Sequence, residues 1–308
     1  MLRIDKASAL LALCTTVTAA VLVGCAETSD ADSASSNGKS ASAEEQKTDQ
    51  VVFSGTKKID VVGHMVNVSC VGSAVDGKPV IVLLSGGGDN LTRLAGIQKS
   101  LSKHYRVCSF DRLGQGASDK PDGPQTIEST GEVLTGVIDH VAGDSPVVLA
   151  GHSLGGLISA RYAPGHQDRI KGLVLMDATA PTQLADLKKG IPESATGPAV
   201  DLREQTLAIL QGQGPEKLKI SDGEVRSAGD IPVEVIQHGQ KYLEQIPEYG
   251  PELEKAWAEG QRKWLELSER SKLSTATSSG HYIYEDQPEV AFEAIQRVAE
   301  QAADRAQG

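Results

Sequence analysis

The 308-residue sequence predicts an α/β fold, in which helices cover both faces of a mostly parallel sheet. Continuous apolar runs at 79–88 and 146–153 are typical of strands that are buried on both faces. Helical patterns alternate with such runs along the chain. The segment 50–308 is long enough for one large domain, and it contains no internal repeat.

The strands are expected in regular order along this domain. Residues 64–72 alternate apolar and polar side chains, as a half-buried strand does, and 105–119 is a strand that breaks into a glycine-rich loop. The full set of expected strands is 64–72, 79–88, 105–119, 146–153, 170–181, 231–239 and 273–281. Helices are expected near 90–103, 126–142, 154–163, 251–268 and 288–304.

The segment 178–230 interrupts this alternation, because it is longer than a crossover helix needs. It is rich in Gly, Pro, Lys and Glu and has one clearer helix near 200–211. We interpret it as a small cap insertion over the end of the sheet where α/β folds bind ligands. A disordered surface loop is the alternative.

The N-terminus predicts export and a lipid anchor. Arg3 and Lys6 precede an apolar run over 7–23, which is typical of a secretory signal. The run ends in Leu-Val-Gly-Cys25, which resembles the lipobox of bacterial lipoproteins. The resemblance implies that 1–24 is a lipoprotein signal peptide and that Cys25 carries the lipid. An ordinary signal peptide is the alternative.

Residues 25–49 are mostly small, polar and acidic, so we expect a disordered acidic tether. The protein is therefore expected to be exported and lipid-anchored, at the outer face of a bacterial cell membrane or in the periplasm. The net charge of −11 and the lack of a basic patch interleaved with aromatic residues argue against a nucleic-acid partner.

Two cysteines, Cys70 and Cys108, lie in the domain. Their spacing matches no zinc-binding pattern, and no metal site is expected. In an exported protein such a pair indicates a disulfide.

The hexapeptide Gly-His-Ser-Leu-Gly-Gly at 151–156 stands between an expected strand and an expected helix. A tight turn alone would explain the glycines. In this setting the motif resembles the nucleophile elbow of the α/β-hydrolase superfamily, and the resemblance covers nearly the whole chain after the tether. It implies that Ser153 is a nucleophile at a helix N-terminus, where the dipole favours developing negative charge.

Two further predictions follow from this resemblance. His281, between the last strand and the last helix, matches the superfamily's histidine loop and is the candidate base. The oxyanion hole is expected from the main-chain amides of Leu154 and Gly87, with Gly88 as an alternative donor. The loop reads Ser-Gly-Gly-Gly from Ser85, where relatives commonly have His-Gly-x. The other histidines are interpreted as packing, surface or structural residues: His64, His104, His140, His152, His166 and His238.

The acid of the triad is less plainly marked. Many relatives carry it after the strand that follows the cap, but this chain reads HGQKYLEQ at 238–245, without an aspartate. Asp177, at the end of the preceding strand, is the expected acid, although it could simply cap a turn. The remaining alternatives are Glu234, Glu244 and Glu248. Asp111 and Arg112 resemble a superfamily loop with a structural role.

Together these residues predict a serine hydrolase that cleaves a small-molecule carboxylic ester, or alternatively an amide, through an acyl-enzyme and without a cofactor. A cofactor-free haloperoxidase-like activity would use the same triad. A ligand-binding lipoprotein without catalysis is the third hypothesis, supported by the missing aspartate after the cap. Epoxide hydrolases and haloalkane dehalogenases are disfavoured, since they use an aspartate where this chain has Ser153.

Overall fold

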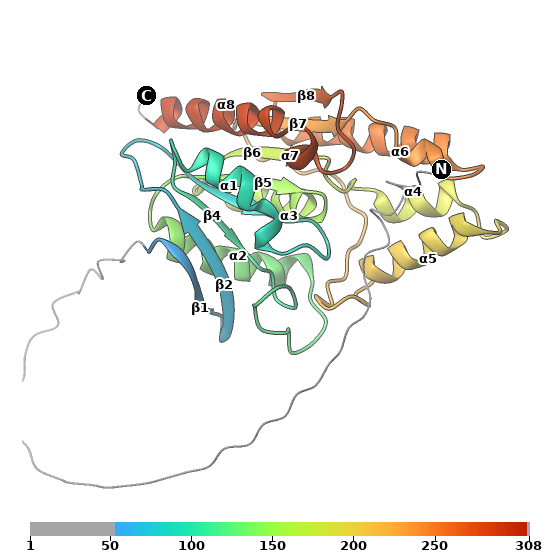
Figure 1. The fold of residues 1–308 in the computed structure, drawn as a ribbon, viewed down its shortest axis with the longest axis horizontal. Coiled ribbons are helices and arrows are strands. Elements are labelled where there is room, and N and C mark those ends of the chain that lie inside the picture. Colours follow the sequence, from blue (N-terminus) through green and yellow to red (C-terminus); the bar gives the residue numbers. More distant parts are fainter. Residues whose placement is uncertain (1–52, 307–308) are drawn as a thin grey trace, which may run out of the picture. The chain divides into compact units, whose positions relative to one another are not determined.

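The computed structural model describes residues 53–306 (Figure 1). The predicted signal peptide (1–24), the predicted tether (25–49) and the lipidation site Cys25 lie outside the described residues. Within 53–306, none of the helices combines the length and the apolar character that crossing a membrane requires.

An eight-stranded sheet in the order β1-β2-β4-β3-β5-β6-β7-β8 forms the centre of the domain. Only the pairings β1–β2 and β2–β4 are antiparallel. The strands are β1 Gly55–Val61, β2 His64–Val71, β3 Val80–Leu84, β4 Val107–Phe110, β5 Val147–His152, β6 Ile170–Met176, β7 Val233–His238 and β8 Ser271–Ala276. This is the α/β-hydrolase fold that the sequence predicts.

Edge strand β1 is missing from the sequence prediction. Five of its seven residues are exposed, so it lacks the apolar periodicity that marked the other strands. Its place depends on a two-residue hairpin loop, in which Val62 and Gly63 both have positive φ, the requirement of a type I′ turn.

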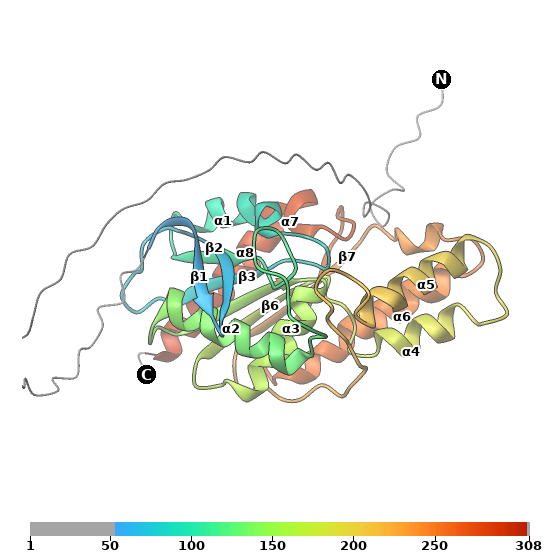
Figure 2. The same ribbon diagram turned by 90° about the horizontal axis from the view of Figure 1, so that it is seen from below.

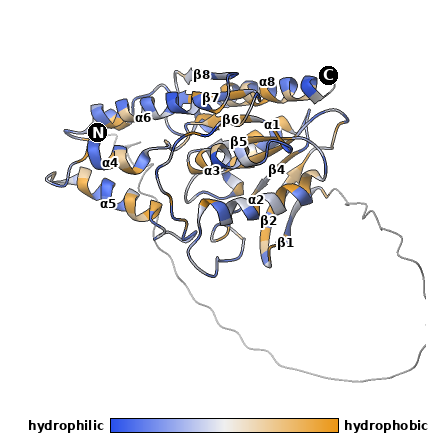
Figure 3. Ribbon diagram, turned by 180° about the vertical axis from the view of Figure 1, so that it is seen from behind, coloured by the Kyte–Doolittle hydropathy of each residue, from blue (hydrophilic) through white to orange (hydrophobic). Residues whose placement is uncertain are grey.

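Helices cover both faces of the sheet, as Figures 2 and 3 show. Apolar side chains of α2 (Ile127–Ala142) and α3 (Leu154–Tyr162) pack in one core with the residues of β3 and β5 that face them. Those of α1 (Ala95–Leu101) and α8 (Pro288–Ala306) form the second core on the opposite face. Strands β3 and β5 are buried along their whole length, as their continuous apolar sequences predict.

The insertion between β6 and β7 is folded and contains two helices, α4 (Gln183–Gly190) and α5 (Pro198–Leu210). The sequence indicated only the second. Helix α6 (Gly250–Lys263), which follows β7, packs against α4, and the three helices lie together at one end of the domain (Figures 1 and 2). The short helix α7 (Ile283–Asp286) completes the set.

The predicted disulfide between Cys70 and Cys108 is confirmed. The two residues are direct partners in the antiparallel pairing of β2 with β4, which brings their Cα atoms to 4.1 Å. In the chain-entropy model, a cross-link that spans 38 residues contributes roughly 3–4 kcal/mol to stability.

Candidate active site

Ser153 occupies a sharp turn between β5 and α3. Its φ of 50° and ψ of −119° lie in a region that side chains rarely adopt, at a cost of about 1–3 kcal/mol. Its side chain does not cap α3, although it stands at the N-cap position. The hydroxyl is therefore not committed to holding the helix.

The glycines around Ser153 are required by close packing. A Cβ atom at Gly151 would collide with the carbonyl of Gly155, and one at Gly155 would collide with the carbonyl of Leu84 in β3. A Cβ at Gly156 would lie 2.5 Å from that of Ala178. Only glycine lets α3 start this close to the sheet, which is the physical reason for the Gly-His-Ser-Leu-Gly-Gly sequence.

His281 follows β8, and its Nδ1 lies 2.7 Å from Asp177 Oδ2. The side chain of His281 is 21% exposed, whereas that of Asp177 is completely buried. His152, next to Ser153, contacts the same histidine: its Nε2 donates to the His281 carbonyl at 2.9 Å, and the ring centres are 4.5 Å apart. The predicted base thus lies against both the elbow and the predicted acid.

The link between Ser153 and His281 runs through His152, the residue before Ser153. Within residues 53–306 the Ser153 hydroxyl and the His281 ring form no hydrogen bond, and the ring of His281 is bonded to Asp177. His152 matches its predicted role as a packing neighbour. Burial and the nearby His281 hold the pKa of His152 well below its usual value, so its ring is neutral.

The glutamates considered as alternative acids lie elsewhere. Glu234 forms a bidentate ion pair with Arg297, and Glu244 pairs with Lys241 at 2.7 Å. Glu248 is exposed. Asp177 is therefore the acidic side chain that contacts His281 among the four candidates.

The Asp177 carboxylate accepts four N–H donors. Besides His281 Nδ1, these are His238 Nδ1 at 2.8 Å, the His238 main-chain amide at 3.1 Å and Trp257 Nε1 at 2.9 Å. Burial opposes ionisation of Asp177, but the hydrogen bonds from His238 and His281 outweigh it and hold its pKa well below the usual range. The carboxylate is thus ionised across the physiological range.

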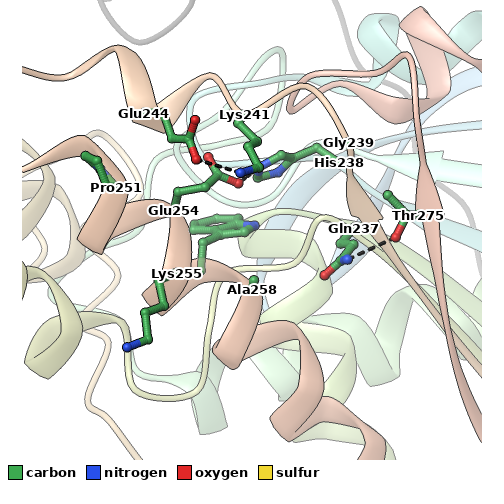
Figure 4. A pocket seen from close by; sticks show the side chains of 11 residues that line it. Gln237, His238, Gly239, Lys241, Glu244, Pro251, Glu254, Lys255, Ala258 and Thr275 are labelled. Atoms are coloured by element: carbon green, nitrogen blue, oxygen red, sulfur yellow. Dashed lines mark hydrogen bonds and ion pairs between the residues drawn. The ribbon is translucent and has the colours of Figure 1, made fainter.

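His238 was not predicted as a site residue, yet it lies between two carboxylates. Its Nδ1 contacts Asp177, and its Nε2 lies 2.7 Å from Oε1 of Glu254 in α6. Burial lowers its pKa, but the hydrogen bonds to Asp177 and Glu254 prevail and raise the pKa to about 9. A cavity of about 300 Å³ opens beside this pair (Figure 4).

One signal in the sequence could have revealed His238. It ends β7, and carboxyl ends of neighbouring parallel strands lie side by side at one edge of a sheet. A titratable residue in the place where relatives usually carry their aspartate would therefore lie beside Asp177, at the end of β6.

The predicted oxyanion residues are neighbours. A Cβ atom at Gly87 would lie 3.4 Å from Cδ2 of Leu154, so the loop after β3 runs directly over the start of α3. Arg112 holds this loop by donating to the carbonyls of Ser85, at 2.6 Å, and Gly86, at 2.9 Å. In a trans peptide the carbonyl and the following N–H point in opposite directions, so Arg112 also fixes the direction of the Gly87 amide.

Arg112 is itself held by the insertion. It forms a bidentate, buried ion pair with Glu216, whose atoms are 2.7 and 3.0 Å from the guanidinium. The adjacent Asp111 accepts the main-chain amides of Leu91 and Ala117. Both residues thus have the structural role that their motif predicts, and Arg112 links the insertion to the loop that carries Gly87.

Comparison with known proteins places this arrangement in context. Residues 79–208 match the family model described as the alpha/beta hydrolase fold. The structure superimposes on a carboxylesterase from Bacillus subtilis with a TM-score of 0.57 and 17% identity, covering 81% of this chain and 92% of that one. At this identity the likeness shows the fold.

Two curated relatives are similar in sequence over part of their length. A 1-acylglycerol-3-phosphate O-acyltransferase from Arabidopsis thaliana is 31% identical over 121 residues, covering 37% of this chain and 28% of the relative. A human (lyso)-N-acylphosphatidylethanolamine lipase is 31% identical over 137 residues, covering 42% and 40%. The chain thus spans less than half of the length of either relative.

We predict that His238 makes the stability of the fold depend on pH. Its pKa in the folded protein, about 9, lies above the ordinary value of 6.5, so its stabilisation is fully present below pH 6.5 and is lost as the pH rises through 9. At about 1.4 kcal/mol per pH unit, the loss is about 3 kcal/mol. Urea unfolding at about pH 6 and pH 10 measures it, and His238→Asn should lack this component. An equal pH dependence in both proteins would contradict the prediction.

Proposed function

Because the chain belongs to the α/β-hydrolase superfamily, we propose that it is a serine hydrolase that cleaves the carboxylic ester bond of a small molecule. One observation carries the proposal: a buried, ionised Asp177 accepts the Nδ1–H of His281, and His281 lies against the strained turn that presents Ser153. These are the three roles that acyl transfer by a serine requires.

In the proposed mechanism Ser153 Oγ attacks the ester carbonyl while His281 Nε2 accepts its proton. Asp177 keeps the other ring proton on Nδ1 and so leaves Nε2 free as the base. The main-chain amides of Gly87 and Leu154 stabilise the negative oxygen of the tetrahedral intermediate. His281 then protonates the leaving alcohol, and a water molecule, activated by the same histidine, releases the acid from the acyl-enzyme.

The ester class draws support from the comparisons, because the similar proteins include a carboxylesterase and a lipase. The hypothesis of a binding protein without catalysis rested on the missing aspartate after the cap. The contact between Asp177 and His281 removes that argument, since the histidine has its carboxylate from the neighbouring strand.

We further propose that the protein is exported and anchored by lipid on Cys25. The lipobox-like sequence before Cys25 supports the anchor, and the Cys70–Cys108 disulfide supports an oxidising compartment. Mass spectrometry of the mature N-terminus should find a chain that starts at lipid-modified Cys25. An unmodified N-terminus at another residue would contradict the anchor without affecting the catalytic proposal.

We predict that Ser153→Ala abolishes covalent labelling by a fluorophosphonate probe and reduces hydrolysis of short p-nitrophenyl esters to background. The reason is that the variant lacks the only atom that forms the acyl-enzyme in this mechanism. Ser100→Ala, which changes an exposed serine of α1, is the matched control and should label normally. Undiminished labelling of Ser153→Ala would refute the assignment.

We predict that Asp177→Asn lowers kcat by as much as ~10⁴-fold, because the amide can hold His281 in the wrong tautomer. The variant should also be less stable, since His238 loses a buried anionic partner. Steady-state kinetics and urea unfolding separate the two effects. Asp139→Asn, which removes only an exposed ion pair with Arg169, is the control. If Asp177→Asn lowers stability but leaves kcat unchanged, Asp177 is a structural residue and the prediction is wrong.

A further inference from the structure

We propose that His238 and Glu254 extend the triad: His238, as a cation between two carboxylates, fixes the orientation of Asp177 and offsets its charge toward His281. His238 is thus a positioning residue that sets the acidic limit of activity. The inference rests on the proposed function, in which His281 is the base, and it adds two residues that the mechanism above does not use.

The contacts form an unbroken line through the interior. Glu254 Oε1 lies 2.7 Å from His238 Nε2, His238 Nδ1 lies 2.8 and 2.9 Å from the two oxygens of Asp177, and Asp177 Oδ2 lies 2.7 Å from His281 Nδ1. Each group comes from a different segment, namely α6, the end of β7, the end of β6 and the loop after β8. Only the His281 end reaches the reaction.

With Asp177 and Glu254 both present as carboxylates, both ring nitrogens of His238 carry protons. A carboxylate accepts hydrogen bonds and does not donate them, so each nitrogen facing one must carry its own proton. The histidine side chain is 1% exposed, and a buried cation is stable only beside opposite charges, which Asp177 and Glu254 supply. Its pKa of about 9 agrees with this state at neutral pH.

Other charged groups near His238 do not replace this pair. Lys241 and Glu244, on the segment after β7, neutralise each other at 2.7 Å, and Lys255 on α6 lines the cavity beside the pair (Figure 4). Tyr242 packs 4.7 Å from the His238 ring, and burial raises the pKa of its phenol well above the usual value, so it is neutral. His281 is a further titratable neighbour, connected to His238 through Asp177.

Two consequences for His281 follow. Since His238 Nδ1 contacts both oxygens of Asp177, rotation of the carboxylate would break these contacts, and Oδ2 stays directed at His281. Without His238, the full negative charge of the buried Asp177 carboxylate would act on His281, and the positive charge on His238 offsets part of it. The extension thus keeps His281 available as a base at lower pH.

The test measures the pH profile of kcat/KM for a p-nitrophenyl ester in two variants, one that removes the positive charge of His238 and one that removes the negative charge of Glu254. His238→Asn keeps an N–H donor near the position of Nδ1 but removes the cation, so the acidic limb should move about one pH unit higher. Glu254→Gln removes an anion and leaves His238 paired with Asp177, so the limb should move lower. His140→Asn, at an exposed position of α2, is the control and should match the wild type.

Shifts in opposite directions support the inference, whereas unchanged limbs, or shifts of the same sign, overturn it. A purely structural role would lower stability in both variants without moving the limbs apart. Fluorophosphonate labelling of the same samples reports on the proposed function separately: a wild type that fails to label refutes that function and leaves the charge state of His238 to be tested directly.

That direct test uses NMR of the wild-type protein with isotope-labelled histidine, so it needs neither activity nor a folded variant. Two protonated ring nitrogens of His238 at neutral pH, titrating near pH 9, are expected. A neutral His238 ring at pH 7 would overturn the inference even if both variants were inactive.

Discussion

The candidate site depends on the hydrogen bonds that the buried Asp177 carboxylate accepts. An isolated charge in the interior is costly unless donors surround it, and here four N–H groups do so. They come from the end of β7, from α6 and from the loop after β8. One ionised oxygen pair thus joins three segments that are far apart in the sequence, and the position of His281 is a result of that convergence.

Backbone strain occurs at the carboxyl ends of two adjacent strands, β5 and β6. Ser153 after β5 and Asp177 after β6 both have positive φ, of 50° and 45°. Main-chain bonds hold them there: the Ser153 amide donates to Met176, the Asp177 amide to Ile236, and the Thr179 amide to the Ser153 carbonyl. The sheet therefore offsets the strain, and the same ladder fixes the spacing between the proposed nucleophile and acid.

The features that could be predicted from the sequence are those that a short stretch of residues determines by itself. Buried strands such as β3 and β5 can be predicted because their sequences are continuous apolar runs. The glycines around Ser153 can be predicted because the close packing there permits only glycine. Exposed β1 carries no such pattern. The role of His238 could not be predicted for another reason. It depends on contacts with Asp177, 61 positions before it, and Glu254, 16 positions after it, and only the folded arrangement brings these residues together.

The buried ion pair between Arg112 and Glu216 joins the insertion to the rest of the domain. Arg112 orients the loop that carries Gly87, while Glu216 belongs to the segment between α5 and β7. Carrying Glu216 away would leave a buried guanidinium unpaired, at a cost of about 3–5 kcal/mol. The ion pair therefore ties the segment around Glu216 to the loop that carries Gly87.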